Sequence, residues 1–375
     1  MGSKINNVEV FYLKIPFKRP FKISTGTVGA PGKPGDHIYL KITTSDGLVG
    51  WGEVRPAPTW MYETPHSVVT TIKYYIASIV KGFEPYQIRE ILYRMDKALA
   101  STLTRGFPFA KSGVEVALFD LLGKLYGAPL HVLLGGKRKN YVEMSYLVSG
   151  PPSEVGEICK HAVEKGFKLM KLKLMGNMEE DYERVKSIFK TCGNVKVWLD
   201  ANQAYRRHTL TLFLRKIRDY LEEITVFEQP VPAYDLESMK YAKKVSPIPI
   251  AADESVFTAQ DLAKLLRIEC VDVVVLKLAK SGIIENLKIS SLAEAFGLDL
   301  YGSGMTESGL GLIASTHLFS VLDIVAPVDT NGPQFLKDLI VDGIQIEGCR
   351  IKVPDKPGLG VKVREEKIEE YRVEL

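Results

Sequence analysis

The chain has 375 residues, of which 46% are hydrophobic and 25% charged, a composition typical of a globular enzyme rather than a disordered or fibrous protein. Its 49 basic and 45 acidic residues are dispersed and leave a net charge of +4, which argues against nucleic acid as a partner. The four cysteines form no CxxC or Cys/His cluster, so neither a zinc site nor a disulfide framework is predicted. Because the chain begins without an apolar signal region and has no membrane-spanning run, we expect a cytoplasmic protein.

The first part of the chain is predicted to be rich in β-structure. Strand-like segments lie at residues 8–15, 37–44 and 47–54. The Gly- and Pro-rich stretch 24–36 between them is predicted to form a long, mobile loop. Residues 66–104 have a helical pattern, and 111–127 form an amphipathic helix that ends at a glycine. We therefore predict an α+β domain over residues 1–125.

From residue 141 onward, strand-like and helical patterns alternate. Eight strand candidates recur at intervals of roughly 23 to 30 residues. They start at residues 141, 169, 195, 225, 248, 272, 298 and 324. This alternation is typical of a (β/α) barrel. A doubly wound open sheet is the alternative, but its Gly-rich phosphate turn does not occur here. We predict a barrel over residues 126–329, and we expect residues 330–375 to pack back on the N-terminal part as one capping domain.

Acidic residues stand at the C-terminal ends of three consecutive predicted strands, where the active site of a barrel lies. They are Asp200, Glu228 and Asp253. Each alone is more often a cap or turn residue, but three in register are harder to explain that way. Crowded carboxylates need neutralisation, and oxygen ligands without His or Cys favour Mg²⁺, with Mn²⁺ as a possible substitute. Asn202 and Glu254 are predicted to support these ligands.

The sequence KLKL at 171–174 places Lys171 and Lys173 on the same face of a strand. Lys277 ends the sixth strand, which lies opposite the second in an eight-stranded barrel. A substrate carboxylate on the metal would therefore hold its α-carbon between Lys173 and Lys277. Lys173 is the candidate base that removes the α-proton while the metal stabilises the enediolate, and the charge of Lys171 favours deprotonation of Lys173. A strand-end lysine with a solvated head is the alternative for Lys277, but Lys280 fits that description better.

These motifs resemble the muconate lactonizing enzyme subgroup of the enolase superfamily, within the mandelate racemase/muconate lactonizing enzyme family. The matching sequences are KLK at 171–173, DAN at 200–202, EQP at 228–230, DES at 253–255 and LKLAKSG at 276–282, with WGEVRPAPTWMYETP, VEVALFDLLGKLYGAPLHVLLGG and PDKPGLGV elsewhere. The resemblance covers nearly the whole chain. It implies a (β/α)₇β TIM-like barrel under an α+β capping domain, and Mg²⁺-assisted α-proton abstraction by an isomerase. The mandelate racemase subgroup would need a catalytic histidine after the seventh strand, whereas His317 lies well into the following helix and is interpreted as structural.

The resemblance leaves several activities open: cycloisomerase, o-succinylbenzoate synthase, N-acylamino acid racemase and dipeptide epimerase. Dipeptide epimerases resemble one another in an Asp-x-Asp after the eighth strand that holds the substrate ammonium. Here Asp329 matches the first acid, and the second is replaced by Asn331. We expect both residues, together with Glu307 after the seventh strand, to contact the substrate. Thr25 and Tyr62 belong to segments that are predicted to close over it.

Two opposed lysines favour a racemase or epimerase acting on an amino-acid derivative or dipeptide, since one lysine takes the α-proton and the other returns it. The alternative is a muconate-type cycloisomerase or an o-succinylbenzoate synthase-like dehydratase. A non-catalytic barrel that binds a carboxylate is a third possibility. The expected partner is a small-molecule carboxylate, without nucleic acid or membrane, in a protein that forms a homo-oligomer.

Overall fold

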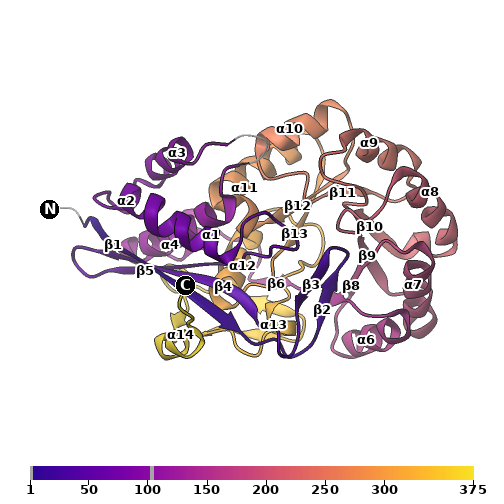
Figure 1. Ribbon diagram of the computed structural model, residues 1–375, viewed down its shortest axis with the longest axis horizontal. Helices are drawn as coiled ribbons and strands as arrows, with labels where there is room; N and C mark the ends of the chain where they lie inside the picture. Colours follow the sequence, from indigo (N-terminus) through magenta and orange to yellow (C-terminus); the bar gives the residue numbers. More distant parts are fainter. Residues whose placement is uncertain (1–2, 102–104) are drawn as a thin grey trace.

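The computed structural model describes residues 3–101 and 105–375. Seven parallel strands form one curled sheet in the order β13-β12-β11-β10-β9-β8-β7. These strands are β7 (Tyr146–Val148), β8 (Leu169–Lys173), β9 (Lys196–Asp200), β10 (Ile224–Glu228), β11 (Ile250–Ala252), β12 (Val273–Lys277) and β13 (Asp299–Ser303). Each coincides with a segment predicted to be a strand, apart from one extra residue at the start of β10, and the TIM-like barrel with a separate capping domain is confirmed (Figure 1).

The segment predicted to be the eighth strand closes the sheet through single bridges rather than through a regular strand. The parallel bridges join Ile324 to Leu300, Val328 to Met144 and Asp329 to Ser303. Pro327 has no backbone N–H and therefore cannot donate to a ladder, which accounts for the interruption. The segment nevertheless contacts both edges of the sheet, so Asp329 lies at the same end of the barrel as the other strand-end residues.

Helices follow the strands and cover the outside of the barrel (Figure 1). They are α6 (Pro152–Glu164), α7 (Met178–Cys192), α8 (Arg207–Lys216), η2 (Arg218–Glu223), α9 (Leu236–Val245), α10 (Ala259–Arg267), α11 (Leu278–Ala295) and α12 (Gly309–Val321). Inside, a separate apolar cluster includes Trp198, Val226, Val275 and Tyr301. The ring of Trp198 meets that of Tyr301 edge-on at 4.9 Å. The interior is therefore a packed core that forms an apolar floor under the strand ends.

The capping domain is built on an antiparallel sheet in the order β1-β4-β5, with β1 at Ile5–Ile15, β4 at Gly35–Thr44 and β5 at Val49–Val54. Helix α4 (Pro108–Tyr126) lies directly on β5. A Cβ on Gly50 or Gly52 would lie 2.3 or 2.2 Å from a backbone oxygen of α4, so only glycine permits this approach. The helix begins three residues before the predicted start and ends, as predicted, at Gly127, which has a φ of 65°.

The structure adds detail to two predictions for the capping domain. The helical pattern predicted over 66–104 is present as α1 (Pro65–Thr71), a π-helical turn η1 (Ile72–Ile76), α2 (Ala77–Val80) and α3 (Ile88–Ala98). Residues 102–104 lie outside the described part of the chain. Of the stretch 24–36, expected to form a long loop, residues 24–29 belong instead to a hairpin of β2 (Phe21–Ile23) and β3 (Gly26–Gly29), because Gly26 adopts a φ of 146° that allows the turn.

The last part of the chain runs over both the barrel and the capping domain. Its elements are α13 (Gly332–Phe335), β14 (Val341–Asp342), β15 (Ile346–Glu347), β16 (Arg350–Lys352), β17 (Lys362–Val363) and α14 (Glu365–Tyr371). Strand β16 pairs with β6 (Tyr141–Glu143), just before the first barrel strand, and α14 contacts β1. A short helix, α5 (Leu130–Leu133), links the capping domain to the barrel. The domain boundaries at 125 and 329 stay predictions. Within the described part of the chain, no helix combines the length and apolar character needed to cross a membrane.

A buried carboxylate fastens the capping domain to the barrel. Glu53 of β5 accepts hydrogen bonds from the backbone N–H of Ser308 at 2.7 Å and of Gly311 at 2.8 Å, at the start of α12. His37 of β4 lies 2.8 Å from the same carboxylate. The positive end of a helix dipole and these donors stabilise the buried charge, so Glu53 fixes how the two domains meet above the strand ends.

Glu53→Gln is expected to lower the free energy of unfolding by about 2 kcal/mol, because an amide turns a donor toward at least one of these N–H groups and loses the charge. Chemical denaturation checks this. The control is Glu9→Gln, which changes an exposed carboxylate in the same sheet and should leave stability unchanged. Equal stability of both variants would contradict this role for Glu53.

Candidate active site

Three buried carboxylates lie side by side at the C-terminal ends of β9, β10 and β11. Asp200 and Glu228 are direct partners in the parallel register of β9 and β10, and Asp253 follows the last residue of β11. All three side chains are fully buried. Burial, together with the neighbouring charges of Asp200 and Asp253, raises the pKa of Glu228 well above its usual range. The structure thus brings together the three acids that the sequence predicted, in a place where they need positive charge.

Lysines flank these acids on both sides. Lys173 ends β8, and its Nζ donates to Asp200 Oδ2 at 2.5 Å and to Asn202 Oδ1 at 3.1 Å. Lys277 ends β12, and its Nζ donates to Asp253 Oδ2 at 2.6 Å. In the sheet, β9, β10 and β11 separate β8 from β12. The two lysines therefore approach the same space from opposite sides of the row of acids.

Lys171 lies one layer deeper on the same face of β8. Its Nζ lies 4.0 Å from the centre of the Trp198 ring and within 3.2 Å of carboxylate oxygens of Glu228, Asp200 and Asp329. Burial alone would lower the pKa of Lys171, but Glu228 and Asp200 outweigh it and raise the pKa well above its usual value. Lys171 therefore stays charged at the base of the site. Two lysines can share one face of this buried strand because acids of the neighbouring strands surround them.

The interpretation of Lys280 as a strand-end lysine with a solvated head is wrong. Its side chain is 1% exposed, and Nζ donates to Asp253 Oδ1 at 2.9 Å and to the carbonyl oxygens of Asp253 and Val275, both at 2.8 Å. Asp253 thus lies between Lys277 and Lys280. Burial would raise the pKa of this carboxyl, but the two lysines lower it below its usual range.

The donor chemistry of the three acids fits a hard divalent cation. Glu228 Oε1 is fully buried and has no hydrogen-bond partner among the described residues, which is costly for a polar oxygen and would be relieved by a bound cation. All three ligands offer oxygen only. Over residues 3–101 and 105–375, however, no three acidic, His or Cys side chains are already gathered as a ligand cage. Each of the three acids instead lies 2.5–2.8 Å from a lysine Nζ.

Asn202 and Glu254 connect the two sides of the site, and their predicted support of the acids stays a prediction. Asn202 Nδ2 donates to Glu254 Oε1 at 3.1 Å, while Asn202 Oδ1 accepts from Lys173. Burial and the charge of Asp253 raise the pKa of Glu254 to about 7. Asn202 adopts a positive φ of 40°, an uncommon conformation for a residue with a side chain. The strained backbone holds its amide between Lys173 and Glu254.

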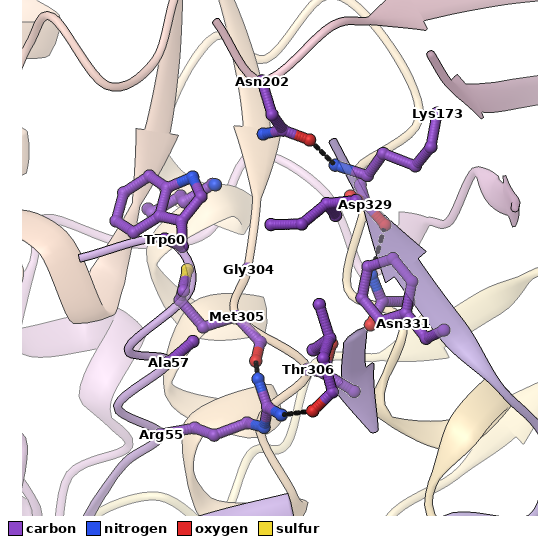
Figure 2. A pocket seen from close by; sticks show the side chains of 14 residues that line it. Arg55, Ala57, Trp60, Lys173, Asn202, Gly304, Met305, Thr306, Asp329 and Asn331 are labelled. Atoms are coloured by element: carbon purple, nitrogen blue, oxygen red, sulfur yellow. Dashed lines mark hydrogen bonds between the residues drawn. The ribbon is translucent and has the colours of Figure 1, made fainter. Parts of the chain in front are cut away.

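A cavity opens above this charged layer, between the barrel and the capping domain (Figure 2). It is lined by Phe21, Ile23, Val28, Arg55, Ala57, Trp60, Lys173, Asn202, Lys277, Gly304, Met305, Thr306, Asp329 and Asn331. Five predicted site residues are in this set: Lys173, Lys277, Asn202, Asp329 and Asn331. Its free volume is about 30 Å³, so the side chains of the capping domain and the barrel lie close together over the strand ends.

The capping domain supplies the apolar part of this lining. Phe21 and Val28 come from the β2–β3 hairpin, and Trp60 comes from the segment after β5. The Nζ of Lys277 lies 4.3 Å from the centre of the Trp60 ring. Arg55 donates to the carbonyl oxygens of Met305 and Val28, which ties the hairpin to the turn after β13 (Figure 2). Sequence reasoning missed Phe21 and Arg55 because neither stands in a strand-end motif of the barrel.

Three residues predicted to bind substrate lie outside the described lining. Thr25 sits in the turn between β2 and β3. Tyr62 is 54% exposed, and its hydroxyl donates to the carbonyl of Arg105 and accepts from the N–H of Phe107. Glu307 turns back to accept from the N–H of Met305 at 2.7 Å, and burial raises its pKa to about 7. Their predicted contact with substrate stays a prediction.

Comparison with known proteins decides the family. The Mandelate racemase / muconate lactonizing enzyme, N-terminal domain family matches residues 7–135, and the Enolase C-terminal domain-like family matches residues 154–367. The chain belongs to the mandelate racemase/muconate lactonizing enzyme family of the enolase superfamily. The resemblance drawn from the strand-end motifs is thereby confirmed.

The family members most similar to this chain include both epimerases and cycloisomerases. The L-Ala-D/L-Glu epimerase of Clostridium acetobutylicum is 32% identical over 96% of this chain and 98% of its own length. The dipeptide epimerase of Enterococcus faecalis, solved with Mg and the dipeptide L-Leu-L-Tyr, is 32% identical over 96% of this chain and 99% of that one, with a TM-score of 0.88. Muconate lactonizing enzyme from Pseudomonas fluorescens, solved with muconolactone, is 28% identical over the full length of both chains, with a TM-score of 0.93. These relatives confirm the prediction of an isomerase of this superfamily.

Proposed function

We propose that this protein is a Mg²⁺-dependent racemase or epimerase that exchanges the α-proton of an amino-acid-derived carboxylate through an enediolate. The observation that carries the proposal is the position of Lys173 and Lys277. Both line one cavity, and they approach it from either side of three strands that each present a buried acid. A carbon held between two amines can lose a proton on one face and regain it on the other.

Each lysine has neighbours that fix its position. Lys173 is held by Asn202 and Asp200, and Lys277 by Asp253 and the ring of Trp60. Lys173 is assigned the role of one base and Lys277 that of the other, while the charge of Lys171 below them attracts the substrate carboxylate. The aromatic side chains of the capping domain exclude water from the reacting carbon.

Asp200, Glu228 and Asp253 would hold the metal, and the unpartnered Oε1 of Glu228 supports this assignment. When bound, Mg²⁺ supplies Lewis-acid stabilisation of the negative charge that develops on the substrate carboxylate. The presence of Mg in the solved structure of the Enterococcus faecalis relative also supports the choice of metal.

The cavity wall around Asn331 supports a substrate with an amide on its α-carbon. Asn331 Nδ2 donates to Asp329 Oδ1 at 2.8 Å, and its own Oδ1 is buried without a partner among the described residues (Figure 2). Such an oxygen can accept from the N–H of a dipeptide or an N-acyl amino acid. Asp329, by contrast, lies 3.2 Å from Lys171 and already has a cation beside it. The apolar lining fits a partly hydrophobic substrate.

Asn331→Leu is expected to raise KM for such a substrate about ten-fold while kcat changes little, because the amide N–H carries no developing charge and its hydrogen bond is equally strong in the ground state and the transition state. Steady-state kinetics on the best substrate check this. If KM stays at the wild-type value, Asn331 serves only to hold Asp329 and does not contact the substrate.

A muconate-type cycloisomerase remains the second candidate, and Arg55 is the observation that favours it. Arg55 is buried, lines the cavity and has an Nε without a partner among the described residues. A second carboxylate of a dicarboxylic substrate could pair with this guanidinium. The test is a screen of dipeptides, N-acyl amino acids and muconates in D₂O. Deuterium at the α-carbon of the amides supports the first proposal, and lactone formation supports the second. A cytoplasmic location and a homo-oligomeric state stay predictions of the sequence.

A further inference from the structure

A second cavity lies on the outer side of the segment that follows the barrel. It is lined by Lys18, Arg19, Met144, Ser145, Tyr146, Lys165, Phe167, Thr330, Asn331, Pro333, Gln334, Ile346 and Gly348. These residues come from the start of the capping domain, from the barrel and from the C-terminal part of the chain. The cavity is therefore a junction of three segments that are far apart in the sequence.

The charges around this cavity are all positive. Lys18, Arg19 and Lys165 line it, and no carboxylate of the described residues lies within ion-pair distance of any of them. Burial and the charges of Arg19 and Lys165 lower the pKa of Lys18. Glu347, which stands between the lining residues Ile346 and Gly348, has its carboxylate within hydrogen-bond distance of the Tyr141 hydroxyl. Lys18 and Lys165 are exposed to solvent and Arg19 is half-buried, so all three charges are available to an anion from solution.

The polar groups at this cavity are suited to an oxyanion. The guanidinium of Arg19 is held in place by a 2.7 Å hydrogen bond to the Tyr146 hydroxyl and by the ring of Phe335, 5.9 Å away. Lys18 Nζ donates to the carbonyl of Pro333 at 2.6 Å, which leaves two of its three N–H groups for a ligand. Thr330, 4% exposed, has a buried hydroxyl without a partner in the described chain.

We propose that this cavity binds a small oxyanion of the phosphate class, held by Lys18, Arg19 and Lys165 with the Thr330 hydroxyl. A phosphate accepts several charge-assisted hydrogen bonds at once, which matches a set of three cations and a hydroxyl. The proposal concerns a site separate from the row of acids and does not depend on the reaction proposed above.

The two cavities share a wall. Asn331 lines both of them, and the ring of Phe335, beside Arg19, stacks on Phe21 of the first cavity at 4.8 Å. An anion at Lys18 and Arg19 would therefore order the segment that carries Asn331 and the strand that carries Phe21. Phosphate is expected to alter KM of the enzyme through this wall, because the bound anion favours one arrangement of the substrate-facing residues.

The test is thermal unfolding in phosphate, in sulfate and in sodium chloride at matched ionic strength. Phosphate should raise the melting temperature of the wild type with a saturating dependence on concentration, beyond the gradual effect of an excluded salt. The variant Lys18→Gln/Lys165→Gln should lose the saturating part of this rise in melting temperature. The control Lys81→Gln/Lys244→Gln removes the same charge from two exposed lysines that do not line this cavity, and it should keep the saturating part of the shift.

A shift of equal size in the wild type and in Lys18→Gln/Lys165→Gln would overturn the proposal, and so would a wild type that shows no saturating shift. If the double variant fails to fold, the single variant Lys165→Gln takes its place, because it changes only one exposed residue at the end of α6. In that single variant, the phosphate concentration that gives half of the shift in melting temperature is expected to be several-fold higher. Unchanged phosphate dependence there would contradict the site as assigned.

Discussion

Lys173→Ala and Lys277→Ala each lose exchange of one substrate enantiomer by a factor of about 10²–10⁴, the usual contribution of a positioned acid or base. The two amines lie on opposite sides of the cavity, so each reaches one face of the α-carbon. Alanine at either position removes the base for one enantiomer and leaves the other base in place. NMR of α-deuterium incorporation from D₂O, with each enantiomer separately, measures both rates.

The exposed lysine variant Lys186→Ala serves as a control and should exchange both enantiomers at the wild-type rate. If Lys277→Ala also exchanges both enantiomers at that rate, the two-base proposal fails. A reaction with a single base, such as lactonization, would then be preferred, with Lys277 acting only as a counter-charge for Asp253.

Asp253→Asn destabilises the protein by about 3–5 kcal/mol, because it leaves Lys277 and Lys280 buried without their shared counter-charge. Both amines contact this carboxylate, at 2.6 and 2.9 Å, and both are almost fully buried. The same change removes one of the three proposed metal ligands, so Mg²⁺ affinity should fall as well. Urea unfolding and calorimetric titration with Mg²⁺ measure the two effects.

Glu254→Gln is the matched control for this change. Burial and the charge of Asp253 raise the pKa of Glu254 to about 7, so near neutral pH its conversion to an amide removes less charge than the same change at Asp253. It should cost much less stability than Asp253→Asn. Equal losses in the two variants would show that the lysines do not depend on Asp253.

The barrel could be predicted from the sequence because strand and helix patterns alternate at regular intervals. In a barrel the C-terminal ends of all parallel strands lie at one end, so the residue that ends each strand is placed there too. Once the strands are placed, Asp200 and Lys277 follow at the same end of the sheet. The spacing of Lys171 and Lys173 in KLKL likewise fixes their shared face. The eighth strand was recognised as a segment, although Pro327 restricts it to single bridges.

Contacts between distant segments could not be read from local patterns. Phe21 and Arg55 reach the cavity only because the capping domain folds over the barrel; Arg55 stands in the matched motif WGEVRPAPTWMYETP, but the motif alone does not place its side chain at the strand ends. Lys280 was misjudged because a lysine three residues after a strand gives no sign that its amine turns back onto Asp253. The glycines of the β2–β3 hairpin suggested an irregular loop, whereas Gly26 allows a tight turn between two short strands.

The central claim is that Asp200, Glu228 and Asp253 hold a divalent metal on which α-proton exchange by the two lysines depends. The most direct test measures exchange in D₂O with enzyme stripped by EDTA and then supplied with Mg²⁺, using a substrate found in the screen. The account predicts no exchange above background in the stripped enzyme and full recovery on addition of Mg²⁺. Full exchange by enzyme shown to be free of metal would contradict it.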